Sequence, residues 1–164
     1  MDFEIRRATP HDLEAIMALE IATFVEDAWS FESMSSELGS EHTYYLVAFE
    51  PERPEVLVGY AGLLAPDGGD GEIQTIAVAP AMRRKGLGRL LMERLIAEAE
   101  IREASQVFLE VRADNPNAHE LYESLGFEQI AVRRGYYQPG NVDAQVMCLP
   151  LERSEPDAPD EDDV

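Results

Sequence analysis

The pattern of apolar and polar side chains at the start of the chain predicts one strand followed by two helices. Residues 3–7 alternate between the two classes, as in a short strand with one buried face. Thr9 and Pro10 then supply the N-cap and the first position of a helix, and apolar side chains at helical spacing extend it to about Phe24. A second, shorter helix begins after Ser30, a candidate N-cap, and stops at Gly39.

Three runs rich in apolar, aromatic and β-branched residues follow and predict a meander of antiparallel strands. The first two, residues 43–49 and 56–64, flank a proline-bounded turn at 51–54. A turn dense in glycine and aspartate at 66–71 leads to the third strand, residues 72–78. This third strand therefore runs directly into the loop that precedes the next helix.

That next helix is amphipathic and leads to a further strand. It opens at Gly86, and its apolar face consists of Leu87, Leu90, Leu91, Leu95 and Ala99. Residues 106–112 then alternate as a strand, with Glu110 near the middle, on the face opposite Val107, Leu109 and Val111. A carboxylate is thus expected in the middle of a largely apolar strand.

The last segments add one helix and two strands. The helix has Asn115 as its N-cap and Gly126 at its stop, and the strands are residues 127–137 and 142–151. No internal repeat is evident. Counted together, the segments predict an α/β chain with about seven strands and about four helices.

Composition is consistent with one globular domain and a tail. The chain has 164 residues, 45% of them hydrophobic, which is enough for one sizeable core. We expect the domain to cover residues 1–151. Residues 152–164 are rich in acids and helix breakers with almost nothing apolar, so we expect a disordered acidic tail.

The charge and the cysteine count narrow the classes of partner. The net charge is −20, so the overall field repels nucleic acid and anionic membranes and attracts basic partners, unless it reflects only solubility or adaptation to salt. No signal peptide and no membrane-length apolar run is evident, so we expect a soluble, cytoplasmic protein. Cys148, the single cysteine, excludes an intramolecular disulfide and a multi-cysteine metal site, and we expect it in the core and no metal.

Residues 74–88 carry the clearest candidate chemistry. They read Gln-Thr-Ile-Ala-Val-Ala-Pro-Ala-Met-Arg-Arg-Lys-Gly-Leu-Gly, a strand that feeds a helix N-terminus through a glycine-containing loop. Unpaired N–H groups at a helix start favour phosphate, and Gly86 and Gly88 remove the side chains that would block its approach. Further cations stand at the same place: Arg83, Arg84, Lys85 and Arg89. The alternative is an ordinary loop with a solvated basic surface.

Two motifs carry a resemblance to a known family that covers residues 2–151. The run Val-x-Pro-x-x-Arg-Arg-x-Gly-Leu-Gly resembles the acetyl-CoA pyrophosphate loop of the GCN5-related N-acetyltransferase (GNAT) superfamily, Arg/Gln-x-x-Gly-x-Gly/Ala. The run Leu-Glu-Val-Arg-x-x-Asn-x-x-Ala-x-x-Leu-Tyr-x-x-Leu-Gly-Phe at 109–127, followed by Arg-Arg-x-Tyr-Tyr at 133–137, resembles the RimI branch. These enzymes acetylate the N-terminal alanine of a small-subunit ribosomal protein.

The resemblance implies a GNAT fold, with a central sheet that is mixed but mostly antiparallel. Strands four and five of this sheet splay apart, and acetyl-CoA, the co-substrate, enters the gap. Backbone groups of Ile76, Ala77 and Val78 would contact the pantetheine arm, and Asn115 would hold it from the other side. The pyrophosphate would lie against Arg83, Arg84, Lys85, Gly86, Leu87, Gly88 and Arg89.

The resemblance also implies two catalytic residues. Glu110 would remove a proton from the attacking amine, directly or through water, and Tyr122 would protonate the departing thiolate. The alternatives are a structural carboxylate paired with Arg112 or Arg134, and a tyrosine that only packs. His119 lies one turn before Tyr122 and is expected at the surface.

The implied activity is acetyl transfer to a protein N-terminus by direct attack in a ternary complex. Tyr136 and Tyr137 would close over the peptide, Gln74 would contact it, and Trp29 and Phe31 would either form a wall of the site or only join the two first helices. The expected partner is a basic ribosomal protein, without nucleic-acid or membrane binding, and the expected state is a monomer or weak dimer. Two other functions stay open: acetylation of a small-molecule amine, and a CoA-binding regulatory module.

Overall fold

The computed structural model describes residues 3–25 and 27–151. The predicted tail at 152–164 lies outside them. In chain order the elements are β1 (Glu4–Arg7), a 3-10 turn (Pro10–Asp12), α1 (Leu13–Thr23), α2 (Phe31–Leu38), β2 (Thr43–Glu50), β3 (Arg53–Leu64), β4 (Gly71–Val78), a second 3-10 turn (Pro80–Met82), α3 (Leu87–Ile101), β5 (Gln106–Arg112), α4 (Pro116–Ser124), β6 (Glu128–Tyr137) and β7 (Val142–Pro150).

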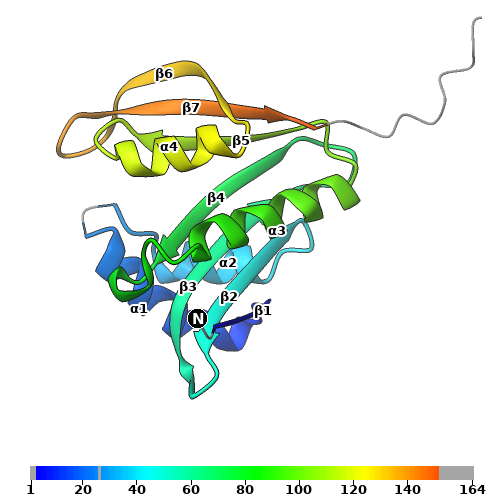
Figure 1. The fold of residues 1–164 in the computed structure, drawn as a ribbon, viewed down its shortest axis with the longest axis vertical. Coiled ribbons are helices and arrows are strands. Elements are labelled where there is room, and N and C mark those ends of the chain that lie inside the picture. The colour runs from blue at the N-terminus through cyan, green and yellow to red at the C-terminus, as the bar shows by residue number, and fades with distance from the viewer. Residues whose placement is uncertain (1–2, 26, 152–164) are drawn as a thin grey trace, which may run out of the picture.

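One mixed sheet runs through the molecule and opens near its middle (Figure 1). Its seven strands have the order β1-β2-β3-β4-β5-β7-β6, and only the β4–β5 pair is parallel. Those two strands pair at only two positions, Gly71 with Val107 and Glu72 with Phe108. Beyond these positions they diverge, so the predicted splay between the fourth and fifth strands is confirmed.

Helices cover both faces of the sheet and bury two apolar clusters. On one face α3 packs over β2, β3 and β4, and its buried side chains Leu87, Leu91 and Leu95 belong to the larger cluster, together with Tyr122 of α4. On the other face α1 and α2 form a second cluster around Tyr60 of β3. Cys148 is buried, as predicted. No helix in the described part of the chain is long and apolar enough to cross a membrane.

Local sequence signals set most of the helix ends. The Ser30 hydroxyl accepts the N–H of Ser33 at 3.1 Å, and the Asn115 side-chain oxygen accepts the N–H of Ala118 at 3.2 Å. Gly126 follows α4 with a φ of 105°, a conformation that favours glycine. These predicted boundaries are confirmed.

Two irregularities in strand pairing were not predicted. β3 begins at Arg53 rather than near residue 56, because the β2–β3 register shifts there and Pro54, which has no N–H, costs no ladder hydrogen bond at a bulge. Between β3 and β4, Gly62 pairs with Thr75 but Leu63 pairs with Ile73. Gln74 is therefore the extra residue of a β-bulge in β4.

Candidate active site

A cavity of about 1110 Å³ lies where β4 and β5 diverge. Its walls come from the end of β4, the start of α3, the end of β5, α4 and the loop that joins α1 to α2 (residues 24–25 and 27–30). Ten of the predicted residues line it: Ile76, Ala77, Val78, Arg83, Arg84, Gly86, Gly88, Arg89, Asn115 and Tyr122. The splay thus brings the predicted phosphate loop and the predicted catalytic tyrosine to one cavity.

Two residues of the predicted loop face elsewhere. Lys85 is exposed and does not line the cavity, and Leu87 is 1% exposed because its side chain belongs to the core under α3. Leu87 can therefore offer only its backbone to a ligand. The amphipathic pattern of α3 already carried this signal, since Leu87 is the first residue of its apolar face.

The N-terminus of α3 has the features of an anion site. Gly86 has a φ of 83° and no side chain caps the helix, so the N–H groups of the first turn have no intrahelical acceptor. A Cβ placed on Gly86 would meet nothing within 4 Å, which leaves open space beside this backbone. A phosphate fits both the unpaired donors and the space.

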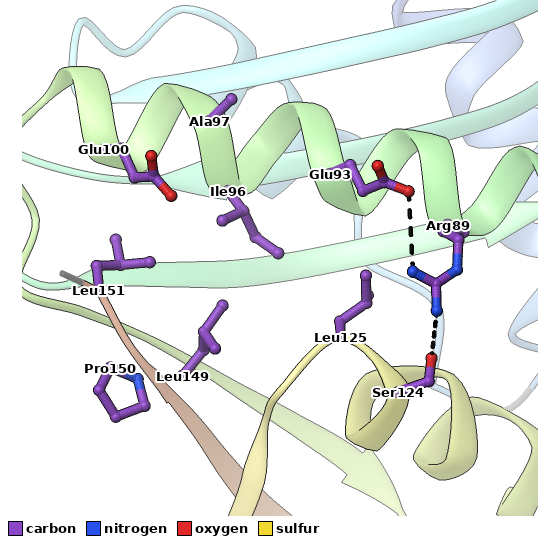
Figure 2. A pocket seen from close by; sticks show the side chains of 10 residues that line it. All are labelled: Arg89, Glu93, Ile96, Ala97, Glu100, Ser124, Leu125, Leu149, Pro150 and Leu151. Carbon is purple, nitrogen blue, oxygen red and sulfur yellow. Dashed lines mark hydrogen bonds and ion pairs between the residues drawn. The ribbon is translucent and has the colours of Figure 1, made fainter.

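Two arginines of the loop are held by the protein itself. The Arg83 Nε donates to the Val78 carbonyl at 3.2 Å. The Arg89 Nη2 donates to the Ser124 hydroxyl at 2.8 Å, which ties the start of α3 to α4, and Nη1 lies 3.9 Å from Glu93 (Figure 2). Arg89 also borders a second cavity of about 650 Å³, whose apolar side chains include Ile96, Leu125, Leu149 and Leu151.

Tyr122 is the catalytic candidate that reaches the main cavity. It is 7% exposed, and its ring packs edge-on against Phe127 with centroids 6.1 Å apart. Burial, with a smaller contribution from Tyr137, raises the pKa of the Tyr122 hydroxyl well above its usual value. The phenol therefore keeps its proton at neutral pH and can donate it.

Glu110 projects from the face of β5 opposite the buried Leu109 and Val111, and it does not line that cavity. Its side chain is 25% exposed, and Oε1 lies 3.2 Å from Nε of Arg133. The pairing with Arg112 or Arg134 that was left open is therefore wrong. Glu110 lies opposite Val146 and Arg133 opposite Ala144 on the intervening strand β7, so both side chains project from one face.

Arg112 makes a cluster that the sequence did not reveal. Its Nε and Nη2 donate to Asp114 at 2.9 and 3.0 Å, and its Nη1 donates to Asp27 at 3.3 Å. The guanidinium also lies 5.0 Å from the centre of the Tyr137 ring. These hydrogen bonds, chiefly that of Asp114, raise the pKa of Arg112 above its usual value. Because Asp27 is far away in sequence, no local pattern could have indicated this contact.

Two of the predicted substrate residues, Tyr136 and Tyr137, lie near Glu110 and do not line the cavity. Tyr136 and Tyr137 pack edge to face at 5.1 Å, and Arg133 lies 5.3 Å from the centre of the Tyr136 ring. Burial and the charge of Glu110 raise the pKa of Tyr137 to about 12.

The three other predicted substrate residues lie on the α1 and α2 side of the sheet. The Gln74 side chain accepts the Tyr45 hydroxyl at 2.7 Å. Trp29 packs against the α1 and α2 cluster, whereas Phe31 is 49% exposed. Trp29 thus does join the two helices, and Phe31 is left open to solvent.

His119 is less exposed than predicted. Its Nδ1 is 2.6 Å from Oε1 of Gln145 and its Nε2 is 2.8 Å from Glu123. Its side chain is only 20% exposed, because α4 packs on the sheet beside β7. It connects α4 to β7 and does not line the cavity.

Comparison with known proteins gives a consistent family. The model of the acetyltransferase (GNAT) family matches residues 13–127. N-alpha-acetyltransferase RimI of Mycobacterium tuberculosis is 36% identical over 143 residues, covering 85% of this chain and 87% of that protein. The [ribosomal protein bS18]-alanine N-acetyltransferase of Salmonella typhimurium is 51% identical over 78 residues, or 46% of this chain and 53% of that protein, about half its length.

A solved structure agrees with these relatives. The crystal structure of the ribosomal-protein-alanine N-acetyltransferase of Escherichia coli has a TM-score of 0.84 and 31% identity, covering 94% of this chain and 97% of that one. The fold, the loop before α3 and the relatives lead to one conclusion: the chain belongs to the acetyltransferase (GNAT) family and is an acetyl-CoA-dependent N-acetyltransferase.

Proposed function

We propose that the protein transfers the acetyl group of acetyl-CoA to the N-terminal α-amine of a protein, namely the N-terminal alanine of a small-subunit ribosomal protein. The observation that carries this proposal is the cavity that joins an anion-binding loop to Tyr122. The relationship to an N-alpha-acetyltransferase over 85% of the chain supports the α-amine as acceptor.

The residues present fit acetyl-CoA. The uncapped N-terminus of α3 and the side chains of Arg83 and Arg84 would bind the pyrophosphate. The last residues of β4 would contact the pantetheine arm. The Asn115 side-chain oxygen accepts the N–H of Ala118, which fixes the side chain, and its amide nitrogen would donate to that arm. The bound molecule supplies an acyl group activated as a thioester.

The chemistry requires three proton transfers, two from the attacking nitrogen and one to the leaving sulfur. The substrate ammonium must first lose a proton to Glu110, directly or through water, so that the nitrogen lone pair can attack the thioester carbonyl. The C–N bond would then form as the C–S bond breaks, and the sulfur would leave with the bonding electrons. The nitrogen would lose its second proton to water, so that ammonium and thioester give amide, thiol and one released proton. Tyr122 donates its proton to that thiolate. The raised pKa of the Tyr122 hydroxyl suits it for this role, because the donor must be protonated beforehand.

An α-amine is easier to deprotonate than a lysine side chain. The ordinary pKa of the first is about 7.7 to 8.0 and that of the second is about 10.4, a difference of roughly 2.4 units or about 3 kcal/mol. Tyr136 and Tyr137 stand beside Glu110, where aromatic rings can enclose the first residues of a peptide. Both features favour a protein N-terminus over a lysine side chain.

Intact-mass analysis after incubation with acetyl-CoA tests the proposal. Peptides that begin Ala-Arg or Ser-Arg should gain one acetyl group, whereas the same peptides with a blocked N-terminus and one internal lysine should not. Acetylation confined to a panel of small amines would favour a small-molecule acetyltransferase. Absence of thiol release with every acceptor would favour a CoA-binding regulatory module.

A further inference from the structure

Glu20, in α1, is a buried carboxyl that the proposed chemistry does not use. It is 1% exposed, and no ion pair within residues 3–25 and 27–151 includes it. Three donors surround it instead. The backbone N–H of Trp29 donates to Oε2 at 2.9 Å, the Thr75 hydroxyl lies 3.3 Å from Oε1, and the Tyr60 hydroxyl also donates to Oε1.

Such a group is unfavourable in a core unless hydrogen bonds compensate it. Burial raises the pKa of Glu20, which agrees with a carboxyl that the surroundings drive towards its neutral form. The placement of the three donors indicates what the carboxyl does.

The donors belong to parts of the molecule that flank the cavity. Trp29 lies in the α1–α2 loop, and three residues of that loop, Phe24, Val25 and Asp27, line the cavity. Thr75 immediately precedes the stretch of β4 that lines the same cavity. One carboxyl thus connects the loop to the strand, and the contact of Asp27 with Arg112 holds the loop to β5 on the far side.

We propose that Glu20 is a positioning residue that fixes the α1–α2 loop against β4. Its two oxygens hold the Trp29 backbone and the Thr75 hydroxyl at one spacing, so the loop keeps its place beside the diverging strands. Glu20 itself does not line the cavity and touches no substrate. The inference rests on the proposed function only in taking this loop as the wall on the amine side.

Two substitutions separate positioning from simple packing. Glu20→Leu keeps the volume and removes both acceptors. Glu20→Gln keeps one acceptor for the Trp29 N–H and presents an amide to the Tyr60 and Thr75 hydroxyls, which can rotate to accept. The matched control is Glu14→Ala, an exposed glutamate of the same helix.

The first measurement does not depend on activity. Trp29 is the only tryptophan, so intrinsic fluorescence reports on the loop directly. We expect Glu20→Leu to shift the emission to longer wavelength and to increase quenching by acrylamide, while Glu20→Gln and Glu14→Ala match the wild type. If the wild type does not acetylate peptides, the proposed function fails while this measurement still decides the role of Glu20.

The second measurement is kinetic. With an Ala-starting peptide, Glu20→Leu should raise the peptide KM about tenfold, with a smaller change in kcat. This factor corresponds to the free energy usually lost with one buried hydrogen bond. Glu20→Gln should have the KM of the wild type. If Glu20→Leu does not fold, Tyr60→Phe takes its place, because it removes one donor without emptying the site. Tyr60→Phe should shift the emission in the same direction. Wild-type emission and KM in Glu20→Leu, or equal damage in Glu20→Gln, would overturn the proposal.

Discussion

The role of the Tyr122 hydroxyl as a proton donor can be tested separately from packing, because only the ring of Tyr122 packs against Phe127. Tyr122→Phe keeps the ring and removes only the proton donor. We expect turnover to fall by about 10² to 10⁴, the usual range for general acid catalysis, with an unchanged Kd for acetyl-CoA. Thiol release and calorimetry measure the two quantities. The control is Tyr44→Phe, on β2 outside the cavity. Full turnover in Tyr122→Phe across the pH range would leave the residue a packing role.

Glu110 differs from Tyr122 in that its partner is a cation, Arg133. Glu110→Gln preserves shape and removes the base. We expect most of the rate near neutral pH to be lost and part of it to return at alkaline pH, where the amine is already free. The measurement is a pH–rate profile on one Ala-starting peptide. A profile that overlays the wild type would remove Glu110 from the mechanism.

The buried carboxyls of Glu20 and Asp12 should change the free energy of unfolding with pH in opposite directions. Burial raises the pKa of Glu20 above its ordinary 4.5, so its folded form binds more protons and stability falls as pH rises through the folded pKa. The hydrogen bond from Arg6 lowers the pKa of Asp12, so its contribution is lost as pH falls through the folded value. Urea unfolding of wild type and Glu20→Gln should show the variant gaining relative stability as the pH rises from the ordinary pKa of 4.5 through the folded pKa of Glu20, because glutamine does not titrate. Parallel curves would contradict this.

Among the elements, the start of α3 offers the cleanest test of cofactor binding. Gly86 is unsuitable, since any side chain at its φ of 83° is strained. At Gly88 a Cβ would meet Leu121 at 3.6 Å and Val78 at 3.9 Å, both ordinary contacts. Gly88→Val should therefore leave the fold intact and weaken acetyl-CoA binding by about tenfold or more, because the branched side chain stands where phosphate approaches the backbone.

Calorimetry with acetyl-CoA measures this effect. The control is Gly39→Val, at the end of α2, where a Cβ would lie 3.5 Å from the Ser35 carbonyl oxygen. An unchanged Kd in Gly88→Val would refute the phosphate-loop assignment.

The elements could be predicted because their signals are local. Ser30, Asn115 and Gly126 mark helix ends through their own chemistry, and the alternation along β5 places Glu110 correctly. The contacts between elements could not be predicted. Arg133 on β6 pairs with Glu110 on β5, with β7 between them, and the Trp29 N–H in the α1–α2 loop donates to Glu20 in α1. Both contacts depend on strand register and on how the elements pack.

The cofactor side of the candidate site was more predictable than the amine side for the same reason. Residues 83–89 form one continuous loop, whose glycines and cations can be recognised together. The amine side draws on separate elements. Beside the bulge at Gln74, Gly62 of β3 has no room for a side chain, because a Cβ there would overlap the Tyr45 ring of β2. No local pattern in β4 indicates a glycine on β3.

At the scale of the whole molecule, the charge of −20 should affect the encounter with substrate. A basic peptide is attracted over a distance that salt shortens, since the Debye length falls from about 30 Å at 0.01 M to about 8 Å at 0.15 M. We expect KM for an arginine-containing peptide to rise with added salt more steeply than KM for a neutral peptide with the same N-terminus. Steady-state kinetics in a salt series measure it, and equal slopes would contradict a steering role for the charge.

The splay between β4 and β5 has a consequence for the protein when no ligand is bound. Past their two shared positions, each strand is bonded on one side only, so the sheet contains two open edges within its own interior. Unpaired strand edges accept other extended chains and are a common origin of aggregation. An amide-bearing ligand that enters the gap would occupy these edges. Acetyl-CoA should therefore slow amide hydrogen exchange along β4 and suppress aggregation on storage, in the way that a donated strand completes a sheet.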